Sequence, residues 1–178
     1  FNINIHINII HIYIYMNGIV NLGNTCYLNS VLQLLLNCNE FNDLVKKYSK
    51  NENIKIVNNF INLYFNNNDP VRPNEFVNFI QEKINNFNGF SQQDSFEFLI
   101  LFLDFIDNNC NNNVNKLFKI TSNINIKCKL INCGNESIHN ETNMFLMLPL
   151  KSTLNESYRD YKSTVRLNKD LIICDKCK

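Results

Sequence analysis

The spacing of apolar residues through the first 110 positions is that of α-helices. Apolar side chains recur every three or four residues, which places them on one face of a helix. Asn24 or Thr25 is expected to cap the first helix, and Asn74 the fourth. The pattern predicts five helices, over residues 24–38, 40–50, 53–65, 74–84 and 91–107. In the first of them the apolar positions are Leu28, Val31, Leu32, Leu35 and Leu36.

The pattern changes after the tract Asn111–Asn113. Residues 117–130 alternate in part between apolar and polar, and Met144–Leu148 is an apolar run that ends at a proline, so both are predicted as strands. Residues 1–15 alternate Ile with Asn or His. They are either an edge strand or sequence upstream of a start at Met16, and we favour the second interpretation. Helices followed by strands indicate an α+β fold.

Composition excludes several classes of protein. Among 178 residues, 17 basic side chains face 16 acidic ones, so the net charge is +1. Neither nucleic acid nor a membrane surface is an expected partner. No apolar run approaches the roughly 18 residues that a membrane-spanning helix needs. We expect the protein to be a monomer. The chain holds 37 asparagines and no alanine, a bias typical of AT-rich genes. Individual asparagines are therefore discounted, and their tracts are interpreted as loop insertions.

The candidate nucleophile is Cys26, which falls in the first turn of the first predicted helix. A helix N-terminus favours negative charge and therefore the reactive thiolate. Its free backbone N–H groups can also receive an oxyanion, and Asn21 could add a side-chain amide. On spacing alone, a purely structural cysteine is the commoner explanation.

The residues on both sides of Cys26 favour the catalytic interpretation. Residues 18–33 read GIVNLGNTCYLNSVLQ and resemble the cysteine box of the ubiquitin-specific protease family. Residues 90–99, FSQQDSFEFL, resemble a second box of that family, with Ser95-Phe96 as mild departures. The resemblance covers residues 17–178. It implies Cys26 as the nucleophile, Asn21 as an oxyanion donor, and Gln92 and Asp94 in the channel that binds the ubiquitin C-terminal tail.

The resemblance also implies a fold and an activity. The fold is that of a papain-like cysteine protease, with a helical thumb over residues 17–110 and the start of β-rich fingers and palm over residues 111–178. The activity is thiol-dependent hydrolysis of peptide or isopeptide bonds at the ubiquitin C-terminus, with ubiquitin or ubiquitinated proteins as partners. The expected location is intracellular, in the cytoplasm, the nucleus or both.

Four of the seven cysteines form two closely spaced pairs. These are Cys128 with Cys133, and Cys174 with Cys177. Two short-spaced pairs suit the tetrahedral coordination of a structural zinc ion, and many members of the family carry such a site in the fingers. The alternative is that these cysteines remain from a lost metal site. Cys38 and Cys110 are expected to be core or incidental thiols.

The histidine that cysteine catalysis needs is the missing element. The three histidines are His6, His11 and His139. The first two precede Cys26, the wrong order for the family, and the third falls in a polar segment between the cysteine pairs. We therefore expect a catalytic domain interrupted before its histidine box, inactive by itself. The alternative is an inactive ubiquitin-binding fragment or a relic of an enzyme.

Overall fold

A computed structural model describes residues 17–87, 91–130, 132–163, 165 and 174–177. The chain divides into two compact units, residues 1–114 and 115–178, which are described separately. Residues 1–16, interpreted above as a leader or an edge strand, lie outside the described residues. The division at residue 110 into thumb and fingers stays a prediction. Among the described residues, no helix is long and apolar enough to cross a membrane.

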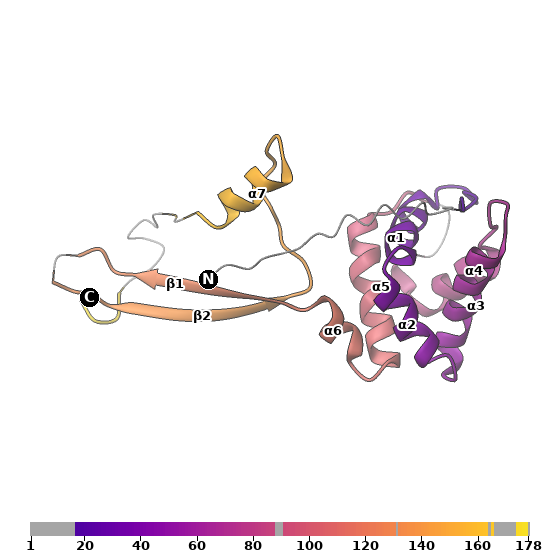
Figure 1. Cartoon of the computed structure of the whole chain (residues 1–178), viewed down its shortest axis with the longest axis horizontal. Helices are drawn as coiled ribbons and strands as arrows, with labels where there is room; N and C mark the ends of the chain where they lie inside the picture. Colours follow the sequence, from indigo (N-terminus) through magenta and orange to yellow (C-terminus); the bar gives the residue numbers. More distant parts are fainter. Residues whose placement is uncertain (1–16, 88–90, 131, 164, 166–173, 178) are drawn as a thin grey trace. The chain divides into compact units, whose positions relative to one another are not determined.

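The first unit is built from helices packed against one another (Figure 1). All five predicted helices are confirmed, with boundaries shifted by a few residues. The helices are α1 (Cys26–Leu36), α2 (Asn39–Lys47), α3 (Glu52–Asn66), α4 (Asn74–Lys83) and α5 (Ser95–Asn109). A short 3-10 turn, η1 (Asn85–Phe87), follows α4. After α5, the chain passes from the first unit to the second within α6 (Asn113–Phe118).

The core of this unit joins α1 to α5. The predicted apolar face of α1 is buried along its whole length. Phe98 of α5 is fully buried, and its ring contacts those of Tyr27, Phe87 and Phe102 at centroid distances of 5.2–5.5 Å. Each such side chain stabilises the fold by about 1.5–3 kcal/mol through burial alone. Since Tyr27 lies in the first turn of α1 and Phe98 in the first turn of α5, the two helices begin at the same end of the unit.

The helix starts differ from the prediction in three places. Thr25 stands before α1, but its hydroxyl accepts no hydrogen bond from the helix. Pro73 takes the capping position of α4, so Asn74 is the first helical residue and not the cap. A proline has no N–H and its fixed φ suits this entry into a helix. The fifth helix begins at Ser95, because Asp94 caps it there.

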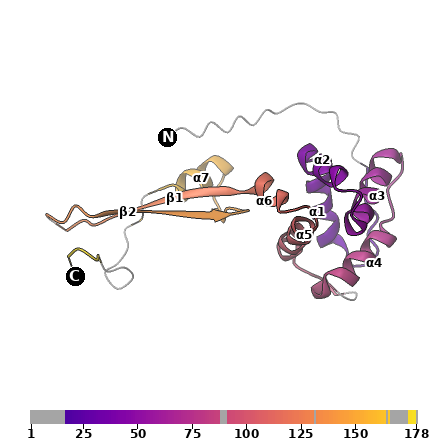
Figure 2. The ribbon, with the colours of Figure 1, turned by 90° about the horizontal axis from the view of Figure 1, so that it is seen from below.

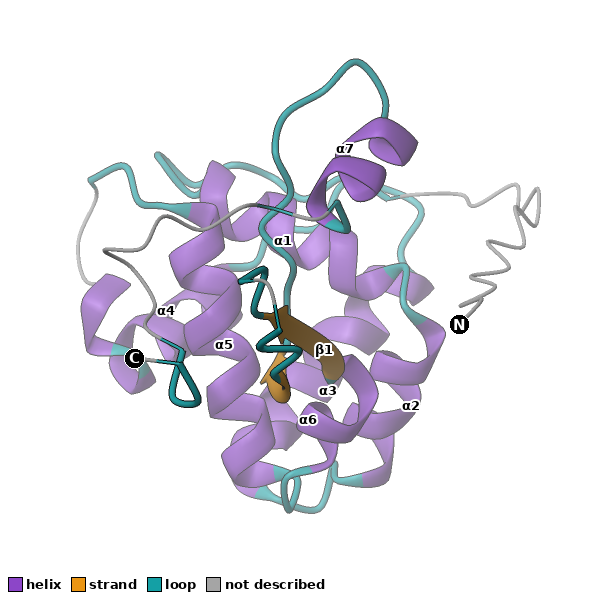
Figure 3. Ribbon diagram, turned by 90° about the vertical axis from the view of Figure 1, so that its left-hand side faces the viewer, coloured by secondary structure: helices purple, strands orange, loops and turns teal. Residues whose placement is uncertain are grey.

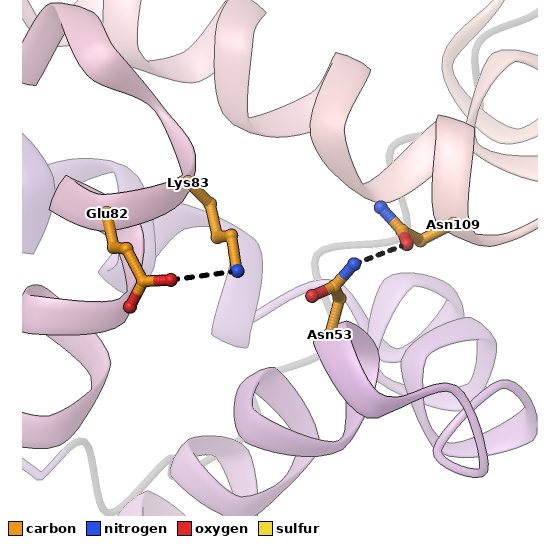
Figure 4. Close-up of polar contacts among 4 residues, drawn as sticks. All are labelled: Asn53, Glu82, Lys83 and Asn109. Carbon is orange, nitrogen blue, oxygen red and sulfur yellow. Dashed lines mark hydrogen bonds and ion pairs between the residues drawn. The ribbon is translucent and has the colours of Figure 1, made fainter.

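Asparagine side chains join several of these helices, so individual asparagines are informative here despite the biased composition. Asn53 at the start of α3 donates to Asn109 at the end of α5 (2.9 Å), whereas the nearby Lys83–Glu82 pair joins neighbours on α4 (Figure 4). Asn113 donates to the hydroxyl of Tyr48 at 2.8 Å. Asn111 and Asn112 adopt φ of 55°, the left-handed region that asparagine tolerates better than most residues. The tract at 111–113 therefore forms the turn that joins α5 to α6.

The second unit contains a two-stranded antiparallel hairpin, β1 (Ile120–Lys127) and β2 (Glu136–Asn143), in which the strands run side by side (Figures 1 and 2). A helix, α7 (Leu154–Tyr161), follows. Figure 3 shows the helices in purple and the strands of this hairpin in orange. A helical region followed by a region with a small sheet confirms the α+β class.

The strand predicted over residues 144–148 was wrong. Residues 136–143 form the partner strand instead, although they are mostly polar and exposed. The pairing ends where Ile120 faces Asn143, because the chain before β1 is already helical in α6. Residues 144–148 therefore have no stretch of β1 left to pair with, and their apolar run ends outside the sheet.

Candidate active site and metal centre

The loop that leads into α1 is fixed to the helices behind it. Ile19 forms a parallel bridge with Val71, supported by hydrogen bonds between Val20 N–H and the Val71 carbonyl and between Val71 N–H and the Gly18 carbonyl, each 2.9 Å. Two side chains of α1 reach back to the same loop. Asn29 donates to the Ile19 carbonyl (3.2 Å) and Gln33 to the Asn17 carbonyl (2.8 Å). These polar residues of the cysteine box received no role from the sequence, and here they anchor the loop.

A tight turn at residues 23–24 delivers the chain to the helix. Gly23 has φ of +97° and Asn24 has φ of 50°. A side chain at residue 23 would meet no neighbouring atom within 4 Å, so backbone conformation alone requires the glycine. The turn places Thr25 at the capping position and Cys26 at the first position of α1.

Asn21 is held by its side-chain oxygen. That oxygen accepts hydrogen bonds from Gly23 N–H (3.1 Å), Thr25 N–H (3.0 Å) and the Thr25 hydroxyl (2.9 Å). Since two of these donors are backbone N–H groups, the accepting atom has to be oxygen and not nitrogen. The amide Nδ2 of this exposed residue donates no hydrogen bond among the described residues. The arrangement leaves Asn21 with a free donor, which an oxyanion site requires.

Cys26 combines exposure with an uncapped helix start. It is the one exposed thiol among the seven cysteines, all of which lie in described residues. The first backbone bond of the helix runs from Asn29 N–H to the Thr25 carbonyl (2.9 Å), so three earlier N–H groups have no partner within the helix. The pKa of the next residue, Tyr27, is raised first by burial and then by its electrostatic interaction with Cys26. An exposed thiol and N–H groups without a helical partner therefore lie together at one helix end, which fits the predicted roles of nucleophile and oxyanion donors.

The N-terminus of α5, unlike that of α1, is capped by a side chain. One carboxylate oxygen of Asp94 accepts from Phe96 N–H (2.6 Å) and from Glu97 N–H (3.2 Å). Asp94 is thus a helix cap, which the spacing of Asp94 and Glu97 in the sequence could have indicated. Gln92 and Asp94 are both exposed, and their predicted contact with a ubiquitin tail stays a prediction.

None of the described residues of the first unit is a histidine. His139 lies on β2 in the second unit, exposed, with its Nε2 3.2 Å from the Ser137 hydroxyl. His6 and His11 fall outside the described residues. The first unit therefore offers a candidate nucleophile and candidate oxyanion donors, but no histidine among its described residues.

The four predicted metal ligands come together in the second unit. Their sulfur atoms all lie within 4.8 Å of one another, with Cys128 and Cys177 at 3.6 Å and Cys133 and Cys174 at 3.7 Å. Four thiolates at about 2.3 Å from a tetrahedral zinc ion would stand about 3.8 Å apart. A disulfide bond of about 2.05 Å is excluded by the same distances. The cluster has the donor set, size and geometry of a structural zinc site, and a bound ion would close the two cysteine pairs onto each other.

Hydrogen bonds within the cluster shift two of its pKa values in opposite directions. The pKa of Cys174 is lowered to about 6, first by the backbone N–H of Lys176 and then by donors from Cys177, Asn135 and Cys133. The pKa of Cys177 is raised, because it keeps its proton in hydrogen bonds to Cys133 and Cys174. By contrast, burial raises the pKa of Cys110 to about 11, as expected of a core thiol.

Comparison with known proteins places these features in a family. The sequence model of the ubiquitin carboxyl-terminal hydrolase family matches residues 17–173. The chain belongs to this family. It is 38% identical over 107 residues to human ubiquitin carboxyl-terminal hydrolase 2, an alignment that covers 53% of this chain and 18% of that protein. It is 30% identical over 90 residues to ubiquitin carboxyl-terminal hydrolase 6 of Schizosaccharomyces pombe, covering 47% and 19%.

A solved structure supports the fold. The SAGA DUB module Ubp8/Sgf11/Sus1/Sgf73 bound to monoubiquitin matches with a TM-score of 0.66 at 20% identity, over 92% of this chain and 42% of that one. The similarity confirms the predicted papain-like architecture of the family. The match spans only about a fifth of the length of these two relatives.

Proposed function

We propose that this chain carries the nucleophile of a deubiquitinating cysteine peptidase. The observation that carries the proposal is the exposed Cys26 at an uncapped helix start, together with the free amide of Asn21. Membership of the ubiquitin carboxyl-terminal hydrolase family and the similarity to a ubiquitin-bound module support ubiquitin as the partner. We expect the protein to act inside the cell.

The reaction would begin at the sulfur of Cys26. Its thiolate attacks the carbonyl carbon at the ubiquitin C-terminus, and the developing oxyanion accepts hydrogen bonds from Asn21 Nδ2 and the Cys26 N–H. The amine leaves with a proton, and water then hydrolyses the thioester. No histidine lies among the described residues of the first unit, so we propose that the base which takes the thiol proton comes from elsewhere and that the 178-residue chain is inactive by itself.

Turnover of a fluorogenic ubiquitin amide tests the proposal in two parts. The 178-residue chain is expected to give no turnover. A longer version of the protein that supplies a histidine should be active, and Cys26→Ser should abolish that activity. Cys38→Ser is the matched control, since Cys38 is half-buried at the start of α2, and it should stay active. Activity that survives Cys26→Ser would overturn the proposed nucleophile.

Binding without catalysis is the alternative outcome. An exposed charge such as that of Asp94 contributes only about 0–1 kcal/mol to binding. Ubiquitin affinity of the chain alone is therefore expected at hundreds of micromolar or weaker. Low-micromolar affinity in a titration with labelled ubiquitin, together with an inactive longer version, would favour a ubiquitin-binding module over a peptidase.

A further inference from the structure

Two polar side chains cross between the cysteine pairs of the second unit in opposite directions. Asn135 lies just after the first pair, and its amide donates to the sulfur of Cys174 in the second pair at 3.5 Å. Lys176 lies within the second pair, and its ammonium donates to the Cys133 carbonyl in the first pair at 3.0 Å. Each pair therefore sends one donor to the other.

The backbone around Asn135 adds to this arrangement. Its carbonyl accepts from Cys128 N–H at 2.9 Å, which closes the turn that holds the first pair. Asn135 is half-buried, so its amide is restricted in the directions it can take. One residue thus shapes the first pair through its backbone and contacts the second through its side chain.

We propose that Asn135 and Lys176 form a reciprocal clasp that holds the two cysteine pairs in register for a metal ion and slows its release. The cysteines of the two pairs are about 40 or more residues apart in the sequence, and the described part of this unit buries only Cys133 and Ser157. With so little apolar packing, side-chain hydrogen bonds decide how well the sulfurs are placed. A donor on a thiolate sulfur also compensates part of the negative charge that four thiolates concentrate around one ion. Both are positioning residues and not metal ligands.

The clasp is tested by the rate at which zinc leaves the full 178-residue chain for a chromogenic chelator. Asn135→Ala and Lys176→Met should each release zinc about 10–100 times faster than the unchanged chain, the usual cost of removing an outer partner of a metal ligand. Lys176→Arg keeps a donor and should restore most of the slow release. Asn135→Asp replaces the donor by a carboxylate that repels sulfur, and should release zinc faster than Asn135→Ala.

Two matched controls separate the clasp from general effects. Lys129→Met removes an exposed lysine next to Cys128 that makes no hydrogen bond among the described residues, and Asn140→Ala removes an exposed asparagine of β2. Both should stay within about twofold of the unchanged chain. Cobalt-loaded clasp variants should keep the absorption of four thiolate ligands. Release rates equal to those of the controls, or the loss of a thiolate from the cobalt spectrum, would overturn the proposal.

Discussion

The two units of this chain reach order by different means. In the first, aromatic and aliphatic side chains from α1, α3, α4 and α5 fill a continuous core, and Phe98 and Phe102 are completely buried. In the second, the described residues bury only Cys133 and Ser157, and large apolar side chains such as Ile138 are 69% exposed. The four cysteine sulfurs therefore take the place of a core there.

The two units are therefore expected to depend on different interactions. A packed core places backbone atoms within narrow limits, which suits the Cys26 loop because the function proposed for it needs two or three donors at fixed positions. A hairpin without a core is marginal in water, and a metal ion supplies the missing stability. The candidate active site should therefore depend on packing, and the hairpin on metal.

Removal of the metal is the largest expected effect. Treatment of zinc-loaded protein with a chelator should increase amide hydrogen exchange throughout β1 and β2, because structural zinc typically supplies about 10–16 kcal/mol. Amides of α1 and α5 should keep their protection. Cys174→Ser should reproduce the effect without chelator. An unchanged hairpin after complete zinc removal would show that the second unit has another source of stability.

Truncation of the core should affect the opposite unit. Phe98→Ala is expected to lower the free energy of unfolding of the first unit by about 3–5 kcal/mol, because it empties the space between three other rings. Denaturant unfolding followed by far-ultraviolet circular dichroism measures this. Phe96→Ala, at a residue 43% exposed on the same helix, is the control and should cost much less. Zinc affinity should not change in either variant, and a parallel loss of zinc would contradict this difference between the units.

The loop before Cys26 should respond to a smaller change. Thr25 is 5% exposed, and its hydroxyl both donates to Asn21 and accepts from Leu22 N–H at 3.0 Å. Thr25→Val leaves the partly buried N–H of Leu22 without a partner, at a cost of about 1 kcal/mol. Thr25→Ser keeps the hydroxyl and should cost less. The Asn21 side-chain amide signals in a nitrogen–proton NMR spectrum should shift in the valine variant only; equal shifts in both variants would exclude a role for the hydroxyl.

The smallest effect concerns Asp94, where two substitutions separate capping from charge. Asp94→Ala removes the cap of α5 and should cost about 1 kcal/mol of stability, whereas Asp94→Asn keeps a capping oxygen and should cost little. If the charge contacts the ubiquitin tail, both variants should weaken ubiquitin binding equally in a titration with labelled ubiquitin. Unchanged binding in Asp94→Asn would leave Asp94 as a helix cap alone.

The sequence predicted what is local and missed what depends on distant partners. Apolar spacing located all five helices, and paired cysteines located the metal centre, because both patterns are complete within short segments. The strand over residues 144–148 was predicted wrongly, because its pairing depends on where β1 begins. The roles of Asn29, Asn53 and Asn113 were missed, since a biased composition hides which asparagines find partners far along the chain.

We propose above that Cys26 is a nucleophile directed at the ubiquitin C-terminus. The most direct test is to map which cysteine forms a covalent adduct with a reactive ubiquitin probe. Zinc-loaded protein would be incubated at mildly alkaline pH with ubiquitin that carries a thiol-reactive electrophile at its C-terminus. Peptide mass mapping is predicted to find the adduct on Cys26, and capture should slow when the probe lacks the flexible ubiquitin tail. An adduct on another cysteine, or equal capture by the tail-less probe, would contradict the account.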